Sequence, residues 1–183
     1  MNRIQILSKQ VTELIAAGEV VERPASVVKE IMENSIDAGA TSITLEIKNG
    51  GITFIRITDN GSGIAKEDVV NAFKSHATSK ISSTDDLGAI VTLGFRGEAL
   101  ASVAAVSKVE LLTRAGDELG SRYCIEGGEQ ILFDEAGCPK GTTLIIRDLF
   151  YNTPARMKFL KKMFRKQMPL RVLLTELHSR IRR

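Results

Sequence analysis

One short stretch of the chain, residues 29–37, carries side chains whose types and spacing could do chemistry. If the stretch is helical, at about 100° per residue, Glu30, Asn34 and Asp37 lie within roughly 60° of one another. A carboxylate and a carboxamide would then project side by side at the edge of the core. Glu33 would point about 100° away from Asn34, towards solvent. We therefore predict that Glu30, and not Glu33, is the glutamate of this stretch that takes part in chemistry.

The element that positions these side chains is predicted to be an amphipathic helix over residues 24–36. Pro24 suits its first turn because proline has no N–H to leave unpaired there. Gly39 follows as the predicted C-terminal stop. Four apolar residues fall in one arc that should pack on a sheet, namely Val27, Val28, Ile31 and Met32. Polar residues on the flank of such a helix are usually only solvated, so the rest of the chain has to decide whether this flank is a site.

Composition indicates an ordinary globular domain. The chain has 183 residues, of which 43% are hydrophobic and 26% charged, enough for one domain with a real core. Cys124 and Cys138 form neither a metal-ligand spacing nor a disulfide framework, so a reducing cytosol is expected. We find no secretory signal pattern and no apolar run near the roughly 18 residues that span a bilayer.

The charge is unevenly distributed along the chain. Residues 156–183 contain ten Lys and Arg residues against a single acidic one, although the whole chain carries a formal charge of only +3. A basic end of this kind is typical of a nucleic-acid contact. It is equally typical of a solvated terminus, and charge alone leaves both interpretations open.

A second candidate site follows the first predicted hairpin. Strands are predicted over residues 43–47 and 52–58, joined by a turn at Gly50-Gly51. The second strand runs into Asp59-Asn60-Gly61-Ser62-Gly63-Ile64. An aspartate at a strand end, followed by two glycines, is a place where backbone can approach a flat ligand closely. A plain turn capped by the aspartate is the alternative.

The remainder of the chain is predicted to complete an α+β two-layer sandwich, with a mixed, mostly antiparallel sheet and helices on one face. Residues 76–98 are mainly loop, a length typical of lids and binding segments. The helix that follows starts beside Gly97, so its free N–H groups could receive phosphate oxygens, unless the glycine is only a hinge. Helices are predicted at residues 66–74, 99–106 and from Pro154, and strands at residues 108–114, 121–126, 130–133 and 142–148.

Four separated motifs resemble, in order, those of the GHKL ATP-binding superfamily, which contains DNA gyrase, Hsp90, sensor histidine kinases and MutL proteins. They are Glu30-x-x-x-Asn34, Asp59-x-Gly61-x-Gly63, Gly94-Phe95-Arg96-Gly97-Glu98-Ala99-Leu100 and Gly141-Thr142-Thr143. Within the superfamily the chain is identified as a member of the MutL mismatch-repair family, on residues 15–24, 76–80, 93–100 and 149–156. The resemblance covers residues 1–162.

The resemblance implies a set of roles in binding ATP and Mg²⁺. Glu30 is similar to the general base that orients and deprotonates the attacking water, and Asn34 to the Mg²⁺ ligand. Asp59 resembles the residue that accepts from the adenine amine, with Thr143 assisting through water and Gly63 leaving room for the ring. The other nucleotide-binding positions implied are Ala38, Ile64, Ala77, Thr78, Ser79, Lys80, Gly94, Phe95, Arg96, Gly97, Glu98, Ala99 and Leu100.

The resemblance also implies a switch. ATP is expected to order residues 76–97 and an N-terminal arm, residues 1–22, and so to drive formation of a homodimer. The implied partners are a MutS-like mismatch sensor, a repair nuclease and DNA, in the cytoplasm and away from membranes. The ATPase domain is expected to span residues 23–162. Residues 163–183 depart from the family, and no second domain that supplies a lysine to the γ-phosphate follows, so we expect a fragment or an altered end.

Two other functions remain open from the residues. A histidine kinase of the same superfamily transfers phosphate to a histidine and needs no water-activating base, and Glu30 in register with Asn34 argues against it. A nucleotide-binding module without turnover is the non-enzymatic alternative. A topoisomerase would need a separate DNA-cleaving domain, for which the chain has no room.

Overall fold

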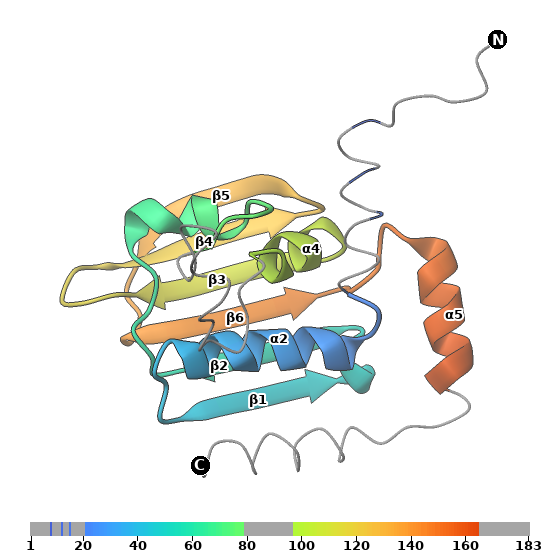
Figure 1. Cartoon of the computed structure of the whole chain (residues 1–183), viewed down its shortest axis with the longest axis horizontal. Coiled ribbons are helices and arrows are strands. Elements are labelled where there is room, and N and C mark those ends of the chain that lie inside the picture. Colours follow the sequence, from blue (N-terminus) through green and yellow to red (C-terminus); the bar gives the residue numbers. More distant parts are fainter. Residues whose placement is uncertain (1–7, 9–11, 13–14, 16–20, 79–96, 165–183) are drawn as a thin grey trace, which may run out of the picture.

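The computed structural model describes residues 8, 12, 15, 21–78 and 97–164 (Figure 1). Its helices and short 3-10 turns are α2 (Pro24–Asp37), η1 (Asn49–Gly51), η2 (Lys66–Asp68), α3 (Val69–Ala72), α4 (Ala99–Ala105) and α5 (Pro154–Phe164). Its strands are β1 (Ile43–Lys48), β2 (Phe54–Asp59), β3 (Lys108–Arg114), β4 (Gly120–Glu126), β5 (Glu129–Ala136) and β6 (Gly141–Arg147). The N-terminal arm, most of the predicted lid and residues 165–183 lie outside the described residues.

The strands form one sheet in the order β1-β2-β6-β3-β4-β5. Every pairing between these described strands is antiparallel, so the mixed sheet that the sequence suggested is corrected to a fully antiparallel one there. The placement of β6 between β2 and β3 matters for function, because it brings the start of a late strand beside the end of an early one. The α+β two-layer architecture is confirmed (Figure 1).

Helix α2 begins and ends where local chemistry requires. Pro24 lies at its first turn, and the four apolar residues of the predicted arc are all buried. At the other end Gly39 has φ +73°, and its N–H bonds the carbonyl of Ile36 at 2.9 Å. The N–H of Ala40 bonds the carbonyl of Ser35 at 3.1 Å, which completes a Schellman motif. The predicted helix stop at Gly39 is therefore confirmed.

The hydrophobic core lies between one face of the sheet and helices α2 and α4, which pack side by side (Figure 1). Helix α4 is fixed at its C-terminal end, where three of its last carbonyls find partners from distant segments. Gly128 N–H bonds Ala104, Asn152 Nδ2 bonds Ala105, and Phe150 N–H bonds the carbonyl of the C-cap residue, Val106. These contacts fix the C-terminal end of α4, and they therefore also fix the orientation of its N-terminal end, at residues 97–100.

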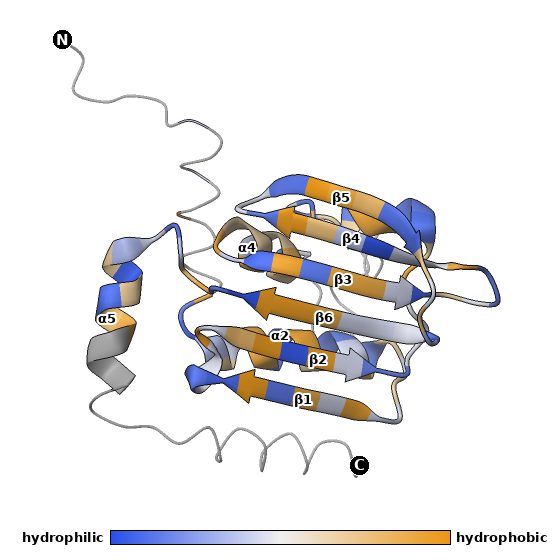
Figure 2. Ribbon diagram, turned by 180° about the vertical axis from the view of Figure 1, so that it is seen from behind, coloured by the Kyte–Doolittle hydropathy of each residue, from blue (hydrophilic) through white to orange (hydrophobic). Residues whose placement is uncertain are grey.

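Polar and apolar residues alternate along several strands (Figure 2), and the residues out of phase with the buried ones lie on the other face of the sheet. Glu110 lies near its centre and accepts from Arg122 Nε at 2.9 Å and Arg147 Nη1 at 3.0 Å. Burial alone would raise the pKa of Glu110, but the hydrogen bonds from the two arginines outweigh it and hold that pKa below the ordinary value. This face is stabilised by its own ion pairs and lies opposite the predicted site.

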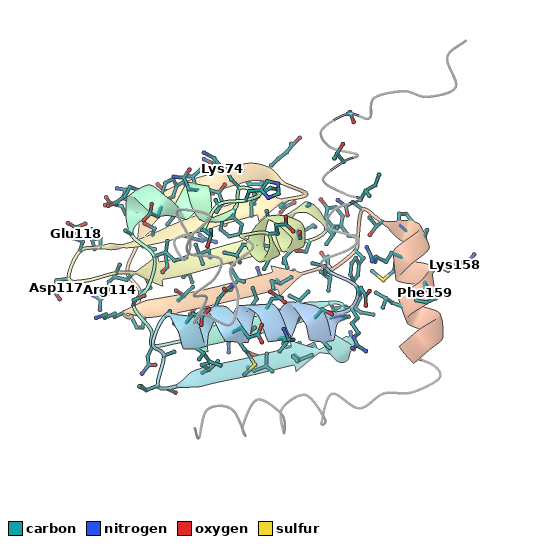
Figure 3. The ribbon with its side chains drawn as sticks, in the orientation of Figure 1. Lys74, Arg114, Asp117, Glu118, Lys158 and Phe159 are labelled. Carbon is teal, nitrogen blue, oxygen red and sulfur yellow. The ribbon has the colours of Figure 1, made fainter. Side chains whose placement is uncertain are left out.

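Helix α5 begins at Pro154 as predicted, and its side chains point partly into solvent. Lys158 and Phe159 project away from the sheet (Figure 3), and Phe159 is 63% exposed. Arg156 lies over the ring of Phe150 at 5.4 Å and Leu160 is buried, so one side of the helix is anchored to the domain. Among the helices of the described residues, none has the length and apolar character needed to cross a membrane.

Candidate active site

A row of polar side chains crosses three neighbouring strands at one end of the sheet. In the strand register Asp59 of β2 lies opposite Thr142 of β6, which lies opposite Thr113 of β3. All three face the helices, because each alternates in phase with buried apolar residues of its strand. Arg114, which follows Thr113, marks this end of the sheet in Figure 3. At this end of the sheet, the face that the helices cover therefore carries a row of polar side chains.

The carboxylate of Asp59 is held by donors from three segments. Its Oδ1 accepts from the backbone N–H of Gly61 at 2.9 Å and of Thr142 at 3.2 Å. Its Oδ2 accepts from the Ser35 hydroxyl of α2 at 2.8 Å. A carboxylate oxygen has room for two hydrogen bonds, so Oδ1 is saturated and Oδ2 keeps one acceptor position. Asp59 is half-buried, so part of its side chain remains accessible.

The structure places Thr142, and not the predicted Thr143, beside Asp59. Thr143 lies opposite Thr58 in the register and donates to the Thr58 hydroxyl at 3.1 Å, on the face away from the helices. Thr142 lies on the same face as Asp59 and donates its backbone N–H to it. Leu144 and Ile146 are buried, and residues two apart on a strand share a face. This alternation predicts that Thr142, and not Thr143, faces the helices.

The glycines after Asp59 let this loop lie directly on β3. Gly63 has φ +73°, and a Cβ there would collide with the backbone carbonyl of Arg114. The next residue, Ile64, donates its N–H to the Thr113 hydroxyl at 2.9 Å. Ser62 N–H bonds the carbonyl of Ala38 at 2.9 Å, which ties the loop to the end of α2 as well. A glycine is therefore required at position 63 because β3 lies too close for a side chain, in addition to any room that it leaves for a ligand.

Gly63→Ala is therefore expected to destabilise the protein by more than a left-handed backbone angle alone, which costs about 1–2 kcal/mol. Gly116 offers a matched control, since its φ is +74° and nothing lies within 4 Å of a Cβ built there. Urea unfolding of both alanine variants measures the difference. Equal losses of unfolding free energy at the two positions would contradict the collision with Arg114.

Glu30 and Asn34 lie on the same half-buried flank of α2, as predicted, but Glu33 does not point to solvent. Glu33 is only 4% exposed, and its Oε2 accepts from Lys29 Nζ at 2.8 Å. The predicted direction of Glu33 was wrong, since its side chain is buried and pairs with the lysine at i−4. The hydrogen bond to Glu33, opposed by partial burial, raises the pKa of the Lys29 ammonium. Lys29 Nζ also lies 3.6 Å from Glu30 Oε1, whose side chain stays 36% exposed.

The two ends of the predicted lid meet at the start of α4. A Cβ at Gly97, which has φ +63°, would collide with the carbonyl of Ala77. His76 Nδ1 lies 3.2 Å from Glu98 Oε1, so a second contact joins the same two segments. Ala77, Thr78 and residues 97–100 are all half-buried. Ser79, Lys80, Gly94, Phe95 and Arg96 lie outside the described residues.

The structure thus brings the first three predicted motifs onto neighbouring elements where it describes them. Helix α2 is tied to the end of β2 by Ser35 and Ala38, and α4 packs beside α2. Two residues that the sequence reading passed over, Ser35 and Thr113, supply hydrogen bonds that hold the polar row together. Thr113 gave no sequence signal, because a threonine at the end of an alternating strand is ordinary.

A protein-family model described as histidine kinase-, DNA gyrase B- and HSP90-like ATPase matches residues 22–125. That range covers more than half of the chain and includes α2, β2 and α4. The chain belongs to this ATPase family. The resemblance seen in the first three motifs is confirmed, since all three lie inside the matched range.

The curated relatives that the chain matches are MutL proteins. The DNA mismatch repair protein MutL of Agathobacter rectalis is 60% identical over 162 residues, which are 88% of this chain but 25% of that protein. A crystal structure of the N-terminal domain of a DNA repair protein has a TM-score of 0.73 at 30% identity, covering 91% of this chain and 47% of that one. The Aquifex aeolicus MutL ATPase domain complexed with ADP has a TM-score of 0.60 at 32% identity, covering 88% and 54%. The chain spans about a quarter of the curated relatives that it matches.

Proposed function

We propose that this chain binds adenine nucleotides and hydrolyses ATP to ADP and phosphate, as the ATPase domain of a MutL-like mismatch-repair protein. The observation that carries the proposal is the Asp59 carboxylate, whose Oδ1 is saturated by backbone donors and whose Oδ2 has one acceptor position left. That acceptor suits the exocyclic amine of adenine. The solved MutL ATPase domain with ADP, at 32% identity, supports nucleotide binding by this fold.

Hydrolysis requires a base beside the terminal phosphate. Glu30 has a half-exposed carboxylate on the flank of α2, four residues before Asn34, where it can orient a water molecule and take its proton. Lys29, 3.6 Å from Glu30 Oε1, limits the directions open to that carboxylate. The backbone at residues 97–100 begins α4 beside α2, on the side where the phosphates would lie.

The side chains present suit Mg²⁺ better than a metal ion that is bound mainly by protein ligands. In the part of the chain that the structure describes, no three His, Cys, Asp or Glu side chains gather as ligands. Mg²⁺ is usually bound by one or two protein oxygens together with phosphate and water oxygens. Asn34 would supply a carboxamide oxygen of this kind, and the ion would neutralise charge on the phosphates.

Calorimetry with ADP, ATP and GDP tests the binding, and release of inorganic phosphate tests the hydrolysis. We expect the 183-residue chain to bind ADP, to discriminate against GDP, and to release phosphate from ATP when Mg²⁺ is added. The absence of ADP binding would contradict the proposal. ADP binding without phosphate release would support the non-hydrolysing module instead.

Thr142→Val is expected to weaken ADP binding about two- to tenfold, the effect of losing one hydrogen bond of about 0.5–1.5 kcal/mol. The reason is that its hydroxyl faces the row that contains Asp59. Thr143→Val is the matched control, since that hydroxyl lies on the opposite face and bonds Thr58. Calorimetric titration of both variants decides between them, and a loss confined to Thr143→Val would restore the original prediction.

Wider roles are proposed on the same family membership. An ATP-dependent homodimer, a MutS-like sensor, a repair nuclease and DNA would be the partners of the whole protein, in the cytoplasm. The relatives named DNA mismatch repair protein MutL support this assignment. The exposed Lys158 of α5 supports a contact with phosphates. The division into an arm over residues 1–22, an ATPase domain over 23–162 and a tail over 163–183 stays a proposal.

A further inference from the structure

The turn after β6, residues 148–153, belongs to a stretch on which the resemblance to MutL rests, but it supplies no group to the site described above. Its backbone is strained at Phe150, which has φ +68°, and Asp148 also has a positive φ, +53°. A bulky residue rarely adopts this conformation. Phe150 has no exposed surface, so its surroundings hold it in place. Strain of this kind is found mostly where a segment has a function.

Two successive N–H groups of the turn bond segments that are far apart in the chain. Leu149 donates to the carbonyl of Ile52, between η1 and β2, at 2.8 Å. Phe150 donates to the carbonyl of Val106, the C-cap residue of α4, at 2.6 Å. The strained turn therefore joins the C-terminal end of α4 to the segment that leads into β2.

The side chain of Asn152 makes a second contact with the same end of α4. Its Nδ2 donates to the carbonyl of Ala105, the last residue of the helix, at 2.8 Å. The helix cannot satisfy that carbonyl itself, because no helical N–H group follows one turn further on. The other polar atom of the side chain, Oδ1, is buried and has no hydrogen-bond partner among the described residues. An unpaired buried acceptor lowers stability, so stability alone does not explain an asparagine at this position.

Helix α4 transmits the position of this end to residues 97–100. It has only 7 residues, roughly 10 Å at 1.5 Å per residue, so it moves as a rigid unit. At its start a Cβ on Gly97 would collide with the carbonyl of Ala77, so the two segments are in contact there. Along its length α4 packs beside α2, which carries Glu30 and Asn34. A change in direction at the C-terminal end would therefore move residues 97–100 relative to both neighbours.

We propose that Asn152 is a positioning residue for the phosphate end of the nucleotide site, acting through the Ala105 carbonyl and α4. The inference rests on the proposed function, in which the phosphates lie beside residues 97–100. It goes beyond that function by giving a role to a residue outside the matched family range, residues 22–125. The base end of the site does not depend on Asn152, because the donors that hold Asp59 come from α2, from β6 and from the loop after β2.

The test compares ADP, which has phosphates, with adenosine, which has none, on the full chain. ADP affinity is measured by calorimetry, and adenosine affinity by displacement of ADP. We expect Asn152→Ala to weaken ADP binding about two- to tenfold, the effect of one hydrogen bond, and to leave adenosine binding nearly unchanged. The ratio of ADP affinity to adenosine affinity then falls, which a general loss of stability would not cause.

Glu110→Gln is the control for lost stability. It weakens the hydrogen bonds from Arg122 and Arg147 on the other face of the sheet, away from α4. We expect a lower melting temperature and an unchanged ratio of ADP affinity to adenosine affinity. A ratio that fell as far in Glu110→Gln as in Asn152→Ala would show an effect of stability alone and would overturn the inference.

The remaining outcomes separate this inference from the function on which it rests. No ADP binding by the wild-type chain would overturn the proposed function and the inference with it. Wild-type ADP binding together with an unchanged ratio in Asn152→Ala, whether both affinities are kept or both are lowered equally, would overturn the inference alone. Should Asn152→Ala fail to fold, Asn152→Asp, which keeps the shape of the side chain but loses its donor, is measured in the same way and is expected to lower the ratio.

Discussion

Replacing Glu30 with alanine is expected to lower ATP hydrolysis by about 10²–10⁴-fold, the usual effect of losing a general base. The affinity for ADP should change little, because Asp59 and Thr142 lie on the sheet and their hydrogen bonds do not involve Glu30. Single-turnover phosphate release, measured beside calorimetric ADP binding, separates the two effects. A variant that loses binding and hydrolysis together would place Glu30 among the binding residues instead.

Glu33→Gln is the control for this experiment on the same helix. Glu33 is buried and paired with Lys29, so a change there affects the stability of the helix. Glutamine keeps the shape but loses the charge, so we expect a lower melting temperature with hydrolysis retained. If Glu33→Gln stopped hydrolysis and Glu30→Ala did not, the assignment of the base would be reversed.

Asp59→Asn is expected to weaken adenine-nucleotide binding by about 1–3 kcal/mol, the cost of leaving a buried polar group badly paired. The fold should tolerate this change. The asparagine oxygen can keep the two backbone donors at Gly61 and Thr142, and its amide can donate to Ser35, whose proton then goes to the carbonyl of Ile31, 3.2 Å away. The amide would face the adenine amine with a second donor, which is the reason for the loss.

The control is the opposite substitution at the next residue, Asn60→Asp. Asn60 Oδ1 accepts from the N–H groups of Thr41 and Ser42, both at 2.9 Å, outside the polar row. Asn60→Asp keeps that acceptor, and the Thr41 hydroxyl can reverse its hydrogen bond, so ADP affinity should stay near the wild-type value. Calorimetry on variants with unchanged melting temperature is the measurement. Wild-type ADP affinity in Asp59→Asn would remove Asp59 from the site.

The sequence by itself determined the elements whose signals are local. Pro24 and Gly39 mark the two ends of α2, and the apolar arc between them is the face that is buried. The alternating strands, the helix starts at Ala99 and Pro154 and the two-layer class followed in the same way. Neighbouring residues alone settle such features, because caps and periodicity depend on a few positions along one chain segment.

Only the tertiary structure decided which side chains meet. Helix phase alone pointed Glu33 towards solvent, whereas in the structure its side chain is buried and pairs with Lys29 one turn earlier. The choice between Thr142 and Thr143 depended on which face of β6 the helices cover. Thr113 joined the site only because β6 lies between β2 and β3, a neighbourhood set by strand order. Strand order and covered face arise from contacts between segments far apart in the chain, and no local pattern records them.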